Sequence, residues 1–231
     1  TDVGAFYWGV IERSLPYLFR EGMTFTLTLN GLAAVGGIFF GTVLAMMRLS
    51  SHRWLSLPAT AYVNLMRSIP LLLVIFWFYF LVPFMGAWIT GASRPIQVGA
   101  FASSVITFMM FEAAYYSEIM RAGIQSISRG QVWAGYALGL NYWQSMKEIV
   151  LPRTFRNMLP IRLTKTIILF QDTSLVYVLS ITDFLGAASK IAQRDGRLVE
   201  MYTFAAIVYF IVSFALSYFV KRLQHRIAIV R

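Results

Sequence analysis

The chain has 231 residues, of which 58% are hydrophobic and 13% are charged. An ordinary soluble domain has about 45–50% apolar and about 25% charged residues, so this composition disfavours a soluble globular enzyme. The absence of cysteine excludes a disulfide framework, a cysteine-ligated metal site and a cysteine nucleophile. In so apolar a chain, the net charge of +10 indicates basic loops on the cytoplasmic side of a membrane.

The first 23 residues lack the basic start and apolar core of a signal peptide. Ile11, Leu15, Leu18 and Phe19 recur at helical spacing among charged neighbours. The pattern predicts a short amphipathic helix lying at the membrane interface. A loosely ordered leader is the alternative interpretation of this segment.

Five segments that follow are apolar enough to cross a bilayer as helices, which requires about 20 residues each. They cover residues 24–47, 69–88 within a longer apolar stretch at 57–92, 98–120, 160–184 and 201–220. The expected fold is therefore all-α, an integral membrane protein with five transmembrane helices. A stripe of small residues in the first span lets another helix approach closely, from the same chain or from a second one. The stripe consists of Ala33, Gly37, Gly41 and Ala45.

Basic residues predict the orientation of these spans. Fourteen lie on one side, namely Arg48, Arg53, Arg67, Arg121, Arg129, Lys147, Arg153, Arg156, Arg162, Lys165, Lys221, Arg222, Arg226 and Arg231. Six lie on the other side, namely Arg13, Arg20, Arg94, Lys190, Arg194 and Arg197. The more basic side is expected to be cytoplasmic, with the N-terminus outside and the C-terminus inside.

The expected organisation has three parts. Residues 1–23 form the periplasmic or interfacial segment, residues 24–220 form the transmembrane domain, and residues 221–231 form a cytoplasmic tail. The long basic loop at 121–157 belongs to the transmembrane domain and faces the cytoplasm.

That loop predicts two short helices set at an angle. A first helix covers residues 132–138, and Gly139 ends it in a left-handed cap. Asn141 caps a second helix over residues 142–150, which is expected to end at Leu151 and Pro152. Two helices joined at a glycine make a compact handle for a soluble partner; a simple interfacial connector is the alternative.

The residues of this loop resemble the cytoplasmic signature loop of ABC importer permeases. The run Gly-Gln-Val-Trp-Ala-Gly-Tyr-Ala-Leu-Gly-Leu-Asn-Tyr-Trp-Gln at 130–144, followed by Ile-Val-Leu-Pro at 149–152, carries the likeness. Further runs at 62–71, 117–127 and 171–175 resemble the polar amino-acid branch. Within it, the runs at 111–118, 170–172 and 194–196 look most like a glutamate/aspartate permease subunit.

The resemblance implies a type I importer fold, with a coupling-helix loop that docks into a cleft of an ATPase and transmits its motion. The coupling residues it implies are Gly130, Gln131, Trp133, Ala134, Gly139, Leu140, Gln144 and Pro152. The family usually has Glu-Ala-Ala where this chain has Trp133-Ala134-Gly135. The missing carboxylate suggests pairing with a different permease chain that retains it.

The implied partners are two copies of an ABC ATPase subunit, a second homologous permease chain in a heterodimer, a periplasmic amino-acid-binding protein and the lipid bilayer of the bacterial inner membrane. No nucleic-acid partner is expected. The chain contains no Gly-Lys dipeptide and hence no Walker A loop, so it is expected to be a transport subunit rather than an enzyme. ATP and magnesium are expected on the ATPase, and no cofactor or metal on this chain.

Charged and polar residues within the spans are the candidates for the substrate site, because ionisable groups in a bilayer usually line a cavity or a paired interface. These candidates are Arg67, Glu112, Tyr115, Gln171, Asp172, Thr173 and Ser174. Glu112 or Asp172 is expected to take the substrate ammonium. The polar run at 171–174 predicts an irregular turn with free backbone N–H groups for carboxylates. Lys165 is expected to lie about 9 Å from Gln171 along the helix axis, toward the cytoplasm, which leaves Arg67 or a partner chain to supply the missing cation.

Glu118 lies on another face of the same helix as Glu112, and we expect it to form a structural ion pair with Arg67 or Arg121. Two other functions remain open from the sequence. One is a permease for another polar amino acid, such as glutamine, arginine or histidine. The other is an ion-coupled carrier or channel, which explains the carboxylates but not the loop at 121–157.

Overall fold

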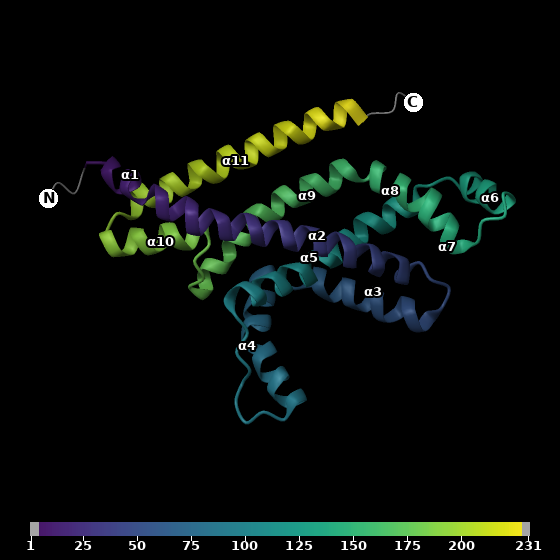
Figure 1. The fold of residues 1–231 in the computed structure, drawn as a ribbon, viewed down its shortest axis with the longest axis horizontal. Coiled ribbons are helices and arrows are strands. Elements are labelled where there is room, and N and C mark those ends of the chain that lie inside the picture. Colours follow the sequence, from purple (N-terminus) through teal and green to yellow (C-terminus); the bar gives the residue numbers. More distant parts are fainter. Residues whose placement is uncertain (1–4, 228–231) are drawn as a thin grey trace.

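The computed structural model describes residues 5–227, which form helices and no strands (Figure 1). The chain begins with α1 (Trp8–Tyr17), a π-helical turn (Leu18–Met23) and α2 (Thr24–Arg48). The following helices are α3 (Arg53–Ser68), α4 (Leu71–Thr90), α5 (Ala100–Gln125), α6 (Arg129–Ala137) and α7 (Tyr142–Ser145). A second π-helical turn (Met146–Val150) leads to α8 (Leu151–Asn157), α9 (Leu159–Asp172), a 3₁₀ helix (Thr173–Leu179), α10 (Phe184–Asp195) and α11 (Leu198–Ile227).

The predicted N-terminal helix forms, but it is not separate from the first span. Residues Trp8–Arg48 make one helix of 41 residues, because the π-helical turn carries the backbone through Arg20 and Glu21 without a break. Val10, Ile11 and Leu18 of this segment are buried, and they pack with Phe184 of α10 in one apolar cluster. The extra residue in a π turn rotates the face that follows it, which a regular helical repeat does not reveal.

By length and composition, three helices of the described residues are apolar enough to span a membrane. They are Trp8–Arg48, α4 and α11; the segment 159–179 with α10 makes a fourth if that pair, bent by 44°, is one span. The remaining expected span, the third one at residues 98–120, corresponds to α5, whose 26 residues reach about 39 Å but include two carboxylates. Residues 228–231 of the expected tail lie outside the described residues, and α11 continues to Ile227.

The stripe of small residues on α2 faces α5. Of the two alternatives, packing within the same chain or against a second chain, the structure shows packing within the same chain. Gly37 and Gly41 are buried, and Cβ atoms built on them would lie 3.0 Å from the Glu112 Cβ and 2.7 Å from the Tyr116 Cβ. The two helices therefore approach so closely that side chains larger than glycine do not fit between them. This contact holds α5 in a fixed register along α2.

Pro70 separates the long apolar stretch at 57–92 into two helices. The residue before a proline avoids helical angles, and Ile69 has φ −100° and ψ 134°. Helix α3 therefore ends at Ser68, and α4 turns away from the bundle (Figure 1). Pro83 lies inside α4 and does not end it. Five consecutive aromatic residues at 76–80 lie on α4, and two of them are largely exposed, Trp77 at 60% and Phe80 at 56%.

The loop at 121–157 forms the predicted angled helices with one difference. Gly139 has φ +82°, which only glycine adopts without strain, and it ends the turn after α6. Asn141 and Gln144 form a reciprocal capping box at the start of α7. The expected stop at Pro152 is wrong, because Pro152 lies in the first turn of α8 and the preceding π turn carries the helix past it. Proline is tolerated in a first turn, where its missing N–H costs no hydrogen bond.

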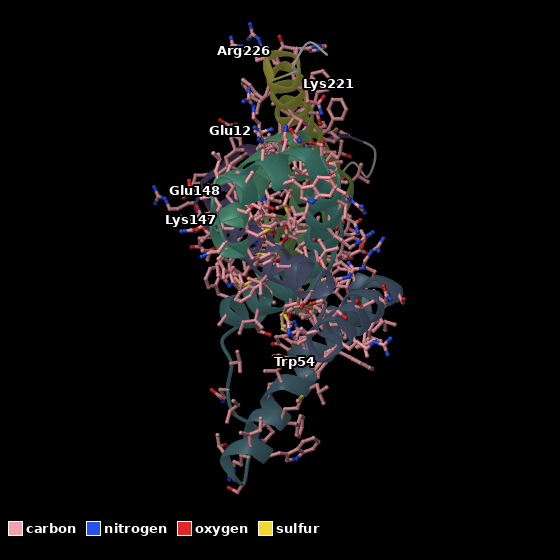
Figure 2. All side chains as sticks on the ribbon, turned by 90° about the vertical axis from the view of Figure 1, so that its right-hand side faces the viewer. Glu12, Trp54, Lys147, Glu148, Lys221 and Arg226 are labelled. Carbon is pink, nitrogen blue, oxygen red and sulfur yellow. The ribbon has the colours of Figure 1, made fainter. Side chains whose placement is uncertain are left out.

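Different helices lie at the two ends of the bundle. Helices α6–α8 and the C-terminal end of α11 lie at one end, while α1 and α10 lie at the other (Figure 1). Viewed from the α6–α8 end, Lys147 and Glu148 extend from one side of the bundle, and Lys221 and Arg226 mark the C-terminal end of α11, which faces the viewer (Figure 2). The start of α1 and the end of α11 therefore lie at opposite ends of the bundle (Figure 1).

We expect Gly41→Val to destabilise the protein, because its Cβ would also lie 2.9 Å from the backbone nitrogen of Ser117. Backbone atoms cannot move aside as flexible side chains do, so α2 and α5 must separate, at a cost of about 1–3 kcal/mol. The matched control is Gly31→Val on the same helix, whose added Cβ meets no described atom within 4 Å. Thermal unfolding of the purified protein should show a lower midpoint for Gly41→Val alone; equal midpoints would contradict the packing account.

Candidate functional site

A hollow of about 390 Å³ lies where α3, α4, α5 and α9 meet, and charged side chains from α3 and α9 line it. Its lining consists of Arg67, Ser68, Ile69, Pro70, Leu71, Phe111, Tyr115, Lys165, Asp172 and Leu175. Three of the residues predicted from the sequence, Arg67, Tyr115 and Asp172, are therefore brought together. This hollow is the candidate substrate site.

The break between α3 and α4 places a helix N-terminus at the hollow. Leu73 and Val74 donate the first backbone hydrogen bonds of α4 to the Pro70 carbonyl, so the N–H groups of Leu71 and Leu72 precede them. Such leading N–H groups have no partner within their own helix, and they carry the positive end of its dipole. Carboxylates bind favourably at this kind of terminus.

The predicted anion-binding turn at residues 171–174 does not form. Asp172 and Thr173 keep right-handed helical angles, and a 3₁₀ helix continues to Leu179 before the chain bends at Ser180. A continuing helix leaves no leading N–H groups exposed at this point. The backbone groups suited to an anion thus lie at Pro70 and Leu71, on a different span from the predicted one.

Lys165 was expected to lie too far from the site, and the structure corrects this. Its ammonium lies 3.1 Å from the Glu112 carboxylate and 4.4 Å from the centre of the Tyr115 ring. Seven residues make about two turns, so Lys165 and Asp172 share one face of α9. The prediction used only the distance along the helix axis and ignored the length of the lysine side chain.

Glu112 lies behind the hollow and is not part of its lining. Its side chain is fully buried between α5 and α9, and Oε2 has no hydrogen-bond partner among the described residues. Its salt-bridge partner is Lys165, whose side chain is 14% exposed. Because a buried carboxylate is stable only when paired, Glu112 fixes the position of Lys165 at the edge of the hollow.

The other predicted residues of the fourth span point elsewhere. Gln171 and Ser174 line a separate hollow with residues of α11, where the Gln171 amide donates to the Ser213 hydroxyl at 3.1 Å. Thr173 is buried and donates to the Phe170 carbonyl. Sequence reasoning missed Lys165 and the backbone at Pro70 as site elements. The signals that point to them are the seven-residue spacing of Lys165 and Asp172 and the Ile-Pro pair after Arg67.

Glu118 forms the ion pairs expected of it, together with a third that was not expected. Its carboxylate binds Arg121 one turn along α5 and lies 2.7 Å from Arg48 of α2. Arg67 of α3 lies 3.7 Å from the same carboxylate. One acidic residue thus joins α2, α3 and α5 beside the hollow.

The candidate coupling residues occupy an exposed platform at the end of the bundle. Trp133, at the position where a carboxylate was expected, is 64% exposed on α6, and Leu138 beside Gly139 is 83% exposed. The opposite side of α6 packs against the π-helical turn at Met146–Val150, since Gly135 is buried and faces Ile149. Gly130, Ala134, Gln144 and Pro152 are exposed, and Gln131 and Leu140 are partly buried. Exposed apolar side chains of this kind are typical of a surface that contacts another protein or a membrane.

A family model described as "Binding-protein-dependent transport system inner membrane component" matches residues 37–229. The chain belongs to this family. It is therefore a multi-pass inner-membrane component of a transport system, and membership implies an ATPase and a substrate-binding protein among its partners. The expectation that the chain is a transport subunit rather than an enzyme is confirmed.

Similar proteins extend the match over almost the whole chain. A "Glutamate/aspartate import permease protein GltK" of Escherichia coli O6:H1 is 53% identical over 223 residues, covering 96% of this chain and 99% of the relative. The "Glutamine transport system permease protein GlnP" of Escherichia coli K12 is 29% identical, covering 97% and 99%. A crystal structure of "an amino acid ABC transporter with histidines" has a TM-score of 0.81 at 27% identity, covering 96% and 99%.

A second solved structure supports the fold alone. An inward-facing methionine ABC transporter, MetNI, matches with a TM-score of 0.74 at 16% identity, covering 92% of this chain and 97% of the other. Together with the family match, these likenesses confirm the expected all-α fold of type I importer permeases.

We expect Lys165→Met to destabilise the protein by about 3–5 kcal/mol, because it leaves the buried Glu112 carboxylate without its partner. The double variant Lys165→Met with Glu112→Gln should recover much of this loss, since no buried charge remains. Lys147→Met is the control, because Lys147 is 83% exposed and lies 3.8 Å from Glu148. Denaturant unfolding measures all three, and a double variant no more stable than Lys165→Met would contradict the pairing.

Proposed function

We propose that this chain is the permease subunit of an ATP-driven importer of acidic amino acids, glutamate and aspartate. The 53% identity to a glutamate/aspartate permease supports this substrate class, as do the charges around the hollow. The proposed site is that hollow, where α3, α4, α5 and α9 meet.

The balance of charge around the hollow carries this proposal. Four cations and three carboxylates form its lining and the ion pairs attached to it, and they leave one unbalanced positive charge. The cations are Arg48, Arg67, Arg121 and Lys165, and the carboxylates are Glu112, Glu118 and Asp172. An acidic amino acid has one ammonium and two carboxylates, and so carries one net negative charge. In a low-dielectric surrounding, binding it neutralises the site, whereas a neutral or basic amino acid leaves charge unpaired.

The proposed binding mode pairs each charged group of the substrate. Asp172 makes no ion pair within residues 5–227, and it is the acceptor for the ammonium. The α-carboxylate binds between Lys165 and the first N–H groups of α4. Arg67 takes the side-chain carboxylate in a bidentate contact, which guanidinium geometry favours.

The transport cycle proposed is alternating access. A periplasmic binding protein delivers the substrate, and two ATPase subunits, which bind ATP and magnesium, close on each other. The exposed α6–α8 surface follows their motion and tilts the spans, with the more basic end of the bundle in the cytoplasm and the N-terminus outside. A second, homologous permease chain completes the cavity, and Trp133 in place of a carboxylate supports a heterodimer rather than two copies of this chain.

Asp172→Asn and Arg67→Gln should affect uptake differently. Losing a charged hydrogen bond costs about 1.5–3 kcal/mol, so Arg67→Gln should lower glutamate uptake at least tenfold and change glutamine uptake little. Asp172→Asn should lower the uptake of both, because both substrates carry the ammonium. Uptake by reconstituted vesicles supplied with saturated binding protein measures these effects, and Arg94→Gln in the exposed loop after α4 is the control. Unchanged glutamate uptake in both variants would place the substrate site elsewhere.

We expect Gly139→Val to assemble with the ATPase but to lose transport, because valine at φ +82° must shift the start of α7. Gly91→Val is the matched control: Gly91 has φ +70° and, like Gly139, open space around it, but it lies at the end of α4. Both variants should lose similar stability, and only Gly139→Val should abolish ATPase stimulation by loaded binding protein. Equal ATPase stimulation in the two variants would contradict a coupling role for the α6–α7 corner.

A further inference from the structure

Three guanidinium groups converge on the single carboxylate of Glu118, and they are not held equally. Arg121 binds Oε1 directly, while Arg48 lies 2.7 Å from Oε2 with its side chain only 10% exposed. Arg67 lies 3.7 Å from Oε2 and is 41% exposed. At that separation the Arg67 contact is an ion pair without a hydrogen bond.

Arg67 therefore keeps its N–H donors available for another acceptor. Its guanidinium also lies 5.8 Å from the centre of the Tyr115 ring, whose face is shared with the Lys165 ammonium. The Tyr115 face attracts both cations toward the hollow. Arg67 lines that hollow, and Glu118 does not.

We propose that Glu118 is a positioning residue that competes with the substrate for Arg67. With the hollow empty, Glu118 holds the guanidinium at its rim. When an acidic amino acid enters, Arg67 transfers from Glu118 to the substrate carboxylate, and Arg48 and Arg121 keep Glu118 paired. This inference rests on the proposed function, and it names the residue that sets the affinity for the acidic side chain.

Competition predicts a gain of affinity when Glu118 loses its charge. Equilibrium binding of labelled glutamate to the permease–ATPase complex in nanodiscs, without binding protein, measures this directly. We expect Glu118→Gln to tighten glutamate binding about threefold, the scale of a partly exposed ion pair. Glutamine binding should not change, because glutamine does not engage Arg67 through a carboxylate. Glu118→Asp keeps the charge and should retain the wild-type affinity.

A purely structural role predicts a different pattern, because damage to packing does not tighten binding. The effect of Glu118→Gln should also disappear when Arg67→Gln is present in the same chain. Asp195→Asn is the matched control, since Asp195 pairs with Arg13 and Arg194 away from the hollow, at the α1–α10 end of the bundle. Weaker or unchanged glutamate binding in Glu118→Gln, or tightening that persists with Arg67→Gln, would overturn the inference.

Arg121→Gln provides a second test if Glu118→Gln does not assemble. Without Arg121, Glu118 has one fewer cationic partner and attracts Arg67 more strongly. Glutamate binding should therefore weaken about threefold, again only when Arg67 is present. Unchanged glutamate affinity in Arg121→Gln would count against competition. Failure of the proposed function is recognised separately, because the wild-type complex would then bind glutamate no better than glutamine.

Discussion

The salt bridge between Glu112 and Lys165 joins α5 to α9, and the candidate site depends on it. A fully buried carboxylate in a membrane protein must be paired, so the length of the lysine side chain determines how α9 lies against α5. The same pair directs the ammonium to the rim of the hollow beside Tyr115 and Asp172. The close contact of α2 with α5 at Gly37 and Gly41 then holds this arrangement from the other side.

The second constraint is the proline after Ile69. It ends α3 and starts α4, which brings both Arg67 and the leading N–H groups of α4 to one place. A helix broken at a binding site combines a fixed charge with backbone dipoles, and broken helices serve this purpose in several transporter folds. The charge balance around the hollow, and not the fold, is what distinguishes acidic from neutral substrates in the proposed function.

Features governed by neighbouring residues could be predicted from the sequence. The left-handed Gly139 and the Asn141 cap both follow from local backbone chemistry. Features that depend on contacts between helices could not be predicted in the same way. The continuous helix from Trp8 to Arg48 and the passage of the chain through Pro152 both involve π turns, which a regular repeat does not reveal.

The site was only partly predictable for the same reason. Arg67, Tyr115 and Asp172 do meet, but Gln171 turns to α11, because adjacent residues on a helix point about 100° apart. Lys165 was set aside on its distance along one helix, although its partner lies on another. The sequence states which charges are present, and the packing of α5 against α9 decides which of them meet.

The central claim is that the hollow between α3, α4, α5 and α9 binds an acidic amino acid. An electron cryomicroscopy structure of the assembled transporter with glutamate, in lipid nanodiscs, tests it most directly. The account predicts density for the substrate between Arg67, Lys165 and Asp172, with one carboxylate at the start of α4. Density beside Gln171 and Ser174, or on the second permease chain alone, would contradict it.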